Sequence, residues 1–276
     1  MYLSGRFVTE DEAGVPLTDR GLTFGDGVYE VYRLYRGRPF RMKAHLERLR
    51  RSAAEIRLPL PEVDWPALHA ELLERNGLVG TDATSRLLAG RPRRGAMRSP
   101  PRRHAADPVR DRPATRVAAG PHVRRRSDGR PLLGRTSDGA AATSRALNLL
   151  GNVLANQAAH EAGAWEAIFV RDGVVTEGTH TNAFAVLDGR VTTHPEGPRI
   201  LSGITRAAVL EVAHAQELPV EEAPVPVTGF REAEEVFLVG TTAEVLPVVR
   251  LDGAPVGSGR PGPVAAGLLR GLRALL

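Results

Sequence analysis

A short run near residue 200 has the residue types and spacing of a site for a negatively charged group. The run 202–205, Ser-Gly-Ile-Thr, opens a helical pattern, so backbone N–H groups at the start of that helix lack partners within it. These N–H groups and the helix dipole favour an anion such as phosphate, and the Thr205 hydroxyl adds a donor. Thr241, in a Gly-Thr-Thr turn, offers another hydroxyl and a backbone amide. A Gly-x-Thr helix start is common, so this run alone is weak evidence for a phosphate site.

The elements that must position these residues read as α/β (α+β) protein. Before residue 83, alternation over 28–34 predicts a strand, and apolar residues spaced three or four apart over 43–56 predict a helix. A second helix is expected over about 65–75, closed by Asn76 and Gly77. After residue 145, helices are expected over 146–162, over 204–215 and from about 263, and strands over 166–170, 174–176, 183–187, 236–239 and 245–251.

The segment between these two parts differs from both. From about 83 to 145 the periodicity collapses into Arg, Pro, Gly and Ala, with no apolar run able to cover a core. Sixteen Arg against four Asp over 84–145 give that segment a net charge of +12, and the total of +5 leaves −7 for the other residues. The basic character of the chain therefore belongs to one segment.

Composition narrows the class of protein. The 276 residues are 42% hydrophobic and 25% charged, enough for a full core in one or two domains. No run of about 18 apolar residues and no N-terminal basic-then-apolar pattern occurs, so we expect neither a membrane span nor a secretory signal, and a cytoplasmic location. The absence of cysteine excludes disulfides and thiolate metal sites, and we expect no metal.

Several longer motifs occur in order along the chain. They are DRGLTFGDGVYE over 19–30, HLERL over 45–49, LNLLGN over 147–152, VTEGTHTN over 175–182, ILSGITR over 200–206 and GTTAE over 240–244. Together they resemble the class IV pyridoxal-phosphate-dependent aminotransferases, and most of all the D-amino-acid transaminases. The resemblance implies a homodimer of fold type IV. It implies a smaller N-terminal α/β domain over 1–120 and a larger, barrel-like cofactor-binding domain over 146–276, with 84–145 atypical.

The resemblance also assigns roles to residues of this chain. Glu177 matches the carboxylate that keeps the pyridine nitrogen of pyridoxal 5'-phosphate protonated, which raises the ring's electron demand. Arg48 matches a cationic phosphate contact, and Tyr29 lines the substrate side. His180 and Asn182 are expected as loop residues near the cofactor. The full set expected to bind the cofactor is Arg48, Glu177, Leu201, Ile204, Thr205 and Thr241.

One position departs from the family pattern. The lysine that forms the Schiff base stands two residues before the Leu-Asn-Leu-Leu-Gly element, and here that position is Arg145. A guanidinium stays protonated, so it neither bonds to the cofactor carbonyl nor moves the substrate proton, whereas a lysine amine does both. The only lysine of the chain is Lys43. We therefore expect the activity of this chain to be impaired.

The atypical segment suggests a cause. Reading it one base forward permits a family-like strand and arginine-bearing turn over 87–96, a strand over 104–115, and Cys-Asp-Ile-Lys over 142–145, with lysine at Arg145. We hypothesise that about 84–145 is a frameshifted translation, from a sequencing error or a lesion in the gene. Part of the N-terminal sheet should then be missing and strand edges left unpaired. The family's substrate-carboxylate Arg and His are also lost.

Other functions remain open. Branched-chain aminotransferase and aminodeoxychorismate lyase are the enzyme alternatives, and a cofactor-binding pseudoenzyme is a third. A basic nucleic-acid-binding protein would use Arg102-Arg103 and 124–126, but no aromatic residue lies between Trp65 and Trp165 to stack on bases. The leading interpretation is transamination of an amino acid with a 2-oxo acid, such as D-alanine with 2-oxoglutarate, with no nucleic acid or membrane as partner.

Overall fold

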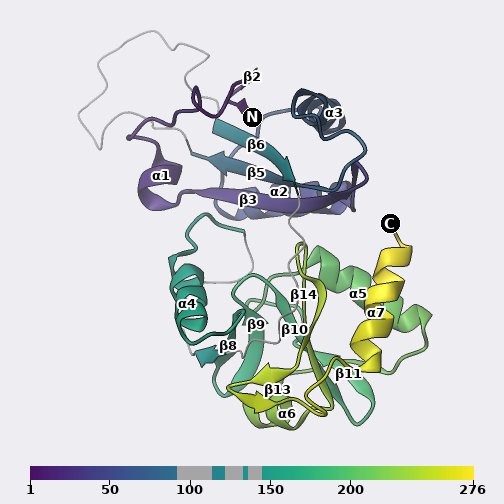
Figure 1. Ribbon diagram of the computed structural model, residues 1–276. Coiled ribbons are helices and arrows are strands. Elements are labelled where there is room, and N and C mark those ends of the chain that lie inside the picture. Colours follow the sequence, from purple (N-terminus) through teal and green to yellow (C-terminus); the bar gives the residue numbers. More distant parts are fainter. Residues whose placement is uncertain (92–113, 122–132, 136–144) are drawn as a thin grey trace. The chain divides into compact units, whose positions relative to one another are not determined.

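The computed structural model describes residues 1–91, 114–121, 133–135 and 145–276, and only the backbone of 114–121 and 133–135. The chain divides into two compact units (Figure 1). Unit 1 consists of Met1–Val123 and Ser144–Asn148, and unit 2 of Arg124–Thr143 and Leu149–Leu276. Expectations that concern 92–113, 122–132 and 136–144 lie outside the described residues.

Unit 1 is built on a sheet in which all neighbouring strands are antiparallel. The strand order is β2-β1-β6-β5-β3-β4. The strands are β1 (Tyr2–Leu3), β2 (Arg6–Phe7), β3 (Gly27–Tyr35), β4 (Arg38–Pro39), β5 (Ala83–Gly90) and β6 (Ala114–Pro121). The helices are α1 (Arg20–Phe24), α2 (Met42–Glu55) and α3 (Trp65–Arg75), close to the two longer helices that the periodicity predicts.

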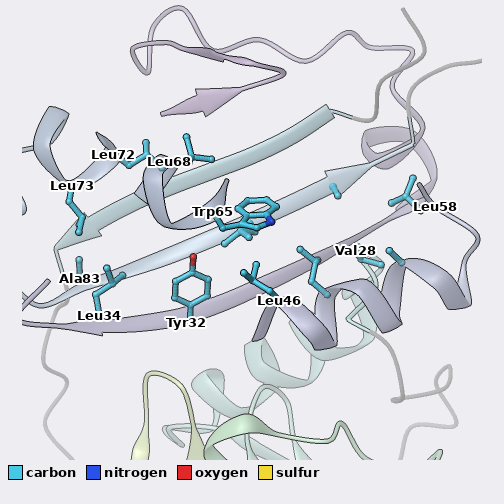
Figure 2. Packing of buried hydrophobic residues seen from close by; sticks show 14 residues of the cluster. Val28, Tyr32, Leu34, Leu46, Leu58, Trp65, Leu68, Leu72, Leu73 and Ala83 are labelled. Carbon is cyan, nitrogen blue, oxygen red and sulfur yellow. The ribbon is translucent and has the colours of Figure 1, made fainter. Parts of the chain in front are cut away.

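The core of unit 1 follows from the alternation of β3. Val28, Tyr32 and Leu34 point to one face of the strand and are fully buried. Figure 2 shows Leu46 of α2 and Trp65 at the start of α3 gathered over that part of the sheet. The helices therefore cover the face that the even-numbered residues of β3 present.

Strand β5 corrects one expectation. We predicted that order ends at about residue 83 and that part of this sheet is missing, and for 83–91 this is wrong. Ala83, Ser85, Leu87 and Ala89 are at most 1% exposed, and β5 pairs with β3 on one side and β6 on the other. The small residues in the run hid a period of two, so the edge of β3 is not left unpaired.

The segment before α4 corrects a second expectation. The helix predicted from residue 146 begins at Leu150 instead, since α4 is Leu150–Glu161. Ala146 forms an isolated antiparallel bridge with Val28, and Leu147 N donates to Gly27 O at 2.9 Å. These extended residues lie alongside β3 because their backbone groups bond to that strand rather than to a helix.

Unit 2 contains a nine-stranded sheet, along which the order is β12-β11-β10-β9-β8-β7. Off this path, β13 pairs with β9, and β14 pairs with both β10 and β15. The strands are β7 (Leu133–Arg135), β8 (Ala167–Arg171), β9 (Val174–Gly178), β10 (Asn182–Leu187), β11 (Arg190–Thr193), β12 (Val220–Glu222), β13 (Val225–Pro226), β14 (Glu235–Gly240) and β15 (Glu244–Val248). A separate hairpin joins β16 (Arg250–Leu251) and β17 (Ala254–Pro255), so the single strand expected over 245–251 is two.

The helices of unit 2 are α4, α5 (Ile204–Ala215), α6 (Val227–Glu232) and α7 (Pro263–Ala274). Strands β10 and β14 are buried, and Phe184 stacks on its register partner Phe237 with ring centres 5.1 Å apart. Helices α5 and α7 pack on each other and on β14. No helix among the described residues is long and apolar enough to cross a membrane.

Candidate functional site

Two predicted site residues of unit 1, Tyr29 and Arg145, lie against each other. Tyr29 N donates to the Arg145 carbonyl at 2.8 Å. The guanidinium carbon of Arg145 lies 4.9 Å from the centre of the Tyr29 ring. Arg145 N in turn donates to Ser52 Oγ of α2 at 3.2 Å. The backbone of Arg145 is thus hydrogen-bonded to β3 and to α2, which fixes the position of its Cα.

Arg48 is held by a buried carboxylate next to Tyr29 in the sequence. Glu30 Oε1 accepts from Arg48 Nε at 2.6 Å, and Oε2 accepts from Arg48 Nη2 at 2.9 Å. His45 Nδ1 donates to Glu30 Oε2 at 2.8 Å. All three residues are at most 3% exposed. Because His45 and Arg48 are three residues apart on α2, both reach the same carboxylate.

These groups set one another's protonation. Burial acts to raise the pKa of Glu30, but hydrogen bonds from His45 and Arg48 and the charges of Arg48 and Arg145 lower it to about 2. Burial lowers the pKa of His45 more than Glu30 raises it. Burial and the charge of Arg145 lower the pKa of Arg48, which a guanidinium tolerates without losing its proton. At neutral pH the cluster holds one carboxylate, a neutral imidazole and two cations.

The position expected for a lysine is occupied by a cation with an unused donor. Arg145 Nε is buried and has no hydrogen-bond partner among the described residues. The only lysine of the chain, Lys43, is exposed in the first turn of α2. The described part of unit 1 therefore offers no buried amine beside Tyr29.

In unit 2, Glu177 is bonded to the segment that precedes α5. Glu177 Oε2 accepts from Leu201 N at 2.8 Å, and Asn182 Nδ2 donates to Leu201 O at 2.9 Å. Glu177 and Asn182 face each other in the register of β9 and β10. We call these three residues the Glu177 clamp. Together they bind both backbone polar groups of Leu201. Asn182 was expected in a loop, but it is the first residue of β10 and its side chain has this structural role.

The start of α5 continues from this clamp. Gly203 is the N-cap residue and has no side chain to cap the first turn, which begins with Ile204 and the buried Thr205. A Cβ at Gly203 would overlap Asn182 Oδ1, so only glycine allows this close approach. The structure thus brings Glu177, Leu201, Ile204 and Thr205 into one continuous stretch of contacts.

A second buried carboxylate organises the turn between Glu177 and Asn182. Glu166 is fully buried and accepts hydrogen bonds from Thr179 Oγ1 at 2.8 Å, His180 N at 2.8 Å and Thr181 Oγ1 at 3.0 Å. Thr179 O also accepts from Asn152 Nδ2 at 2.5 Å. The turn is fixed by side chains from outside it.

Thr241 directly follows β14, next to that turn. Asn182 and Val239 are register partners across β10 and β14. A Cβ added to Gly240 would come within 3.2 Å of Thr181 Cγ2, which shows how closely the two turns approach. Thr241 is therefore near the 178–181 turn, whereas Tyr29, Arg48 and Arg145 form their own group in unit 1.

Sequence reasoning missed four buried polar residues of these groups, namely Glu30, His45, Ser52 and Glu166. Glu30 shares the parity of Val28 and Tyr32 in β3, so alternation alone would have placed it on the buried face. No comparable signal exists for Glu166, since its partners come from a turn well downstream of it in the sequence. No group of three or more His, Asp or Glu that could hold a metal occurs in the described part of the chain.

A family model described as Amino-transferase class IV matches residues 27–251. The chain belongs to the class IV aminotransferases. It is 37% identical over 270 residues to a D-alanine aminotransferase of Bacillus licheniformis, with 96% of this chain and 92% of that protein covered. It is likewise 37% identical over 277 residues to a D-alanine aminotransferase of Staphylococcus aureus strain MSSA476, with 98% and 95% covered.

Solved class IV structures share the fold. The branched-chain amino acid aminotransferase from Escherichia coli has a TM-score of 0.81 at 28% identity, covering 98% of this chain and 91% of that one. A branched-chain aminotransferase from Thermoproteus uzoniensis with norvaline has a TM-score of 0.82 at 28% identity, with 99% and 93% covered. The predicted fold class, α/β with the fold of this family, is confirmed.

A class IV aminotransferase is a pyridoxal-phosphate-dependent enzyme, and the donors described here fit that cofactor in part. One solved branched-chain amino acid aminotransferase of the same fold carries pyridoxamine 5'-phosphate. An uncapped helix start and a buried arginine suit a phosphate, and a carboxylate fixed by a backbone N–H suits a protonated ring nitrogen. Covalent attachment needs an amine, and beside Tyr29 there is a guanidinium instead. The side chains of this class IV aminotransferase therefore fit noncovalent holding of the cofactor and do not fit its covalent anchoring.

Proposed function

We propose that this protein transfers an amino group from an amino acid to a 2-oxo acid, with D-amino acids such as D-alanine, and 2-oxoglutarate, as its substrates. The D-alanine aminotransferases similar over nearly the whole chain support this substrate class. The observation that carries the proposal is the Glu177 clamp, which holds a carboxylate at a fixed place before the start of α5. In the sequence given, the reaction is impaired because Arg145 replaces the lysine.

The cofactor, when bound, supplies the electron sink for the reaction, and the residues of this chain hold and orient it. Glu177 would stabilise the protonated ring nitrogen, with Leu201 fixing its carboxylate. Ile204 and Thr205 at the start of α5, with Thr241, would hold the phosphate. Arg48 keeps the role of cationic phosphate contact that the family resemblance implies. Support comes from the contacts within each unit, where these residues lie in two connected groups.

Tyr29 is proposed to line the substrate side. Its backbone N–H is bonded to Arg145, which leaves the half-buried ring as the part able to contact a ligand. In the family reaction a neutral lysine amine at position 145 would accept and return the substrate proton. A guanidinium offers no neutral amine, so the Arg145 side chain cannot act as that proton acceptor.

We propose a frameshift over about 84–145 as the origin of Arg145, with the first residues of that segment excepted. Residues 83–90 form strand β5, which pairs on both sides and is buried on one face, so a change of frame is not needed to explain them. Resequencing the gene tests the proposal directly. An intact frame through codon 145 would rule out a sequencing error, and two compensating insertions or deletions that bound the segment would support it.

The activity is tested with the whole chain and a single-residue change. Pyridoxal phosphate is added, the mixture is reduced with borohydride and denatured, and the cofactor that remains bound to protein is measured by fluorescence. The chain as given should retain none at position 145 and should form no pyruvate from D-alanine with 2-oxoglutarate. Arg145→Lys, or restoration of the segment to the other frame, should gain both. Cofactor trapped on Lys43 together with turnover would overturn the assigned role of position 145.

A second candidate is the branched-chain amino acid reaction. Several solved branched-chain aminotransferases share the fold, with a TM-score of 0.84 for the one that carries pyridoxamine 5'-phosphate. Arg145→Lys assayed with L-leucine and with D-alanine separates the two, because only the matching substrate should be turned over. Release of an aromatic product from aminodeoxychorismate would instead indicate the lyase.

We propose that the protein is a homodimer, that it is located in the cytoplasm and that it binds no nucleic acid. Support for the dimer comes from α4, where Leu150, Val153 and Leu154 are each at least 58% exposed on one side of the helix. The domain limits 1–120 and 146–276 likewise stay predictions. Sedimentation of the purified chain, with and without DNA, tests the assembly and the absence of nucleic acid together.

A further inference from the structure

The charges around Tyr29 do not cancel. Arg48 shares the carboxylate of Glu30 through two hydrogen bonds, and that carboxylate also accepts from His45. Arg145 lies close enough to lower the pKa of Arg48 and of His45 by its charge. Two guanidinium groups therefore share one carboxylate, which leaves a net charge of +1 in a largely buried cluster.

Arg145 also has an unused donor. Its Nε is buried without a partner among the described residues, and its guanidinium lies over the face of the Tyr29 ring. A cation over an aromatic ring is attracted to it, but this contact gives Arg145 Nε no hydrogen-bond partner. A planar guanidinium presents paired donors that match the oxygens of a phosphate or a carboxylate.

We propose that Arg145, together with Arg48, forms an oxyanion-binding site beside Tyr29, which takes a phosphate or carboxylate group without any covalent bond. The site lies wholly in unit 1, since Tyr29, Arg48, Ser52 and Arg145 all belong to it. Backbone bonds from Arg145 to Ser52 and Tyr29 hold the second cation next to α2. A bound anion would accept a hydrogen bond from Arg145 Nε and would also neutralise the net positive charge of the cluster.

The proposal is tested by binding of two probes to the whole chain at low ionic strength, inorganic phosphate and 2-oxoglutarate, measured by isothermal titration calorimetry. Arg145→Met should weaken binding of the preferred probe at least about tenfold, as expected for loss of a charge-assisted hydrogen bond. Arg145→Lys keeps the charge but loses the paired donors and Nε, so its binding should fall between that of the parent and that of Arg145→Met. The probe that binds more tightly shows whether the oxyanion is a phosphate or a carboxylate.

Arg86→Met is the matched control, because Arg86 is exposed on β5 of the same unit and its loss changes the net charge equally. It should leave binding unchanged. A second measurement guards against misfolding: without anion, Arg145→Met should melt at the same temperature as the parent or higher, and added phosphate should raise only the melting temperature of the parent. Equal binding by the parent and Arg145→Met, or equal loss in Arg86→Met, would overturn the site.

The oxyanion site and the proposed function can fail separately. If phosphate binding depends on Arg145 and the Arg145→Lys variant shows no transamination, the oxyanion site is supported and the proposed function is contradicted. Transamination by Arg145→Lys, with anion binding indifferent to Arg145→Met, would do the reverse.

Discussion

Glu30 is a fully buried carboxylate shared by two side chains of α2. Its charge is maintained by its partners, since burial opposes ionisation and the pKa is nevertheless lowered to about 2. Buried charges are tolerated only when such partners are present. Arg48 therefore depends on Glu30 both for its charge balance and for its direction.

Replacing Glu30 by glutamine should be costly. Glu30→Gln removes the negative charge and leaves Arg48 uncompensated, so we expect a loss of about 3–5 kcal/mol in the free energy of unfolding, measured by urea denaturation. Glu47→Gln, on the exposed side of the same helix, is the control and should change stability by less than about 0.5 kcal/mol. Equal, small effects in both variants would show that the buried ion pair is dispensable.

Gly203→Ala tests the Glu177 clamp. The added methyl would overlap Asn182 Oδ1, so the segment holding Leu201 must shift, at an expected cost of about 1–3 kcal/mol. Binding of pyridoxal phosphate, followed by its absorbance, should weaken as well. Gly151→Ala in α4 meets no atom within 4 Å and should be neutral or slightly stabilising. A Gly203→Ala protein as stable as the parent contradicts the clamp.

Among the elements, β5 is the one that sequence reasoning undervalued. Its two neighbouring leucines provide a matched test, because Leu87 is 1% exposed and Leu88 is only half-buried on the other face. Leu87→Ala should cost about 2–5 kcal/mol through lost burial and a cavity, and Leu88→Ala clearly less. Urea unfolding of both variants measures the difference. If Leu87→Ala proved harmless, the strand would not form in the frame given.

Helix α3 is joined to β3 and β5 by a buried imidazole. His69 Nδ1 donates to Trp65 O at 2.7 Å, and Nε2 accepts from one of two neighbouring hydroxyls, that of Ser85 at 2.8 Å or that of Tyr32. This pattern needs a neutral ring, and burial lowers the pKa of His69 below its ordinary value of 6.5. The network therefore loses its acceptor when the imidazole is protonated.

The pH dependence of stability follows from the sign of these shifts. His69 and His45 both have lowered pKa values, so the unfolded chain binds more protons below about pH 6.5 and stability falls as the pH drops through that value. Glu30 adds a further loss between its ordinary pKa of 4.5 and about 2. Melting temperature measured from pH 8 to pH 5 should decline, less steeply in His69→Gln than in His214→Gln, whose ring is exposed. The same slope in both variants would contradict this account.

How far the sequence predicts these elements depends on what encodes them. Helices α2, α3, α5 and α7 follow from apolar spacing. The motifs over 175–182 and 200–206 contain most of the residues that lie near the start of α5. Strand β5 was missed because its buried face uses Ala and Ser, which carry little hydrophobic signal. The bridge of Ala146 to Val28 was missed because local propensity favours helix and a distant strand overrides it. Partners of Glu30 and Glu166 depend on tertiary contacts that no local pattern contains.

For the whole molecule, the proposed dimer can be tested on α4. Val153 is 58% exposed beside Leu150 and Leu154, so Val153→Glu should place a charge in the interface and shift the chain toward monomers in analytical ultracentrifugation. Val79→Glu makes the same change at a valine that is 68% exposed elsewhere and should leave the assembly unchanged. If the parent chain sediments as a monomer, the proposed dimer is contradicted.

The exposed position of Lys43 has a practical consequence. With one lysine and no cysteine in 276 residues, an amine-reactive dye has a single side chain to modify, and the N-terminus is its one competitor. The N-terminal ammonium is less accessible because it donates to Val8 O at 2.8 Å. A fluorophore on Lys43 would sit on the helix that carries His45 and Arg48, and its emission would report on that helix without any engineered attachment point.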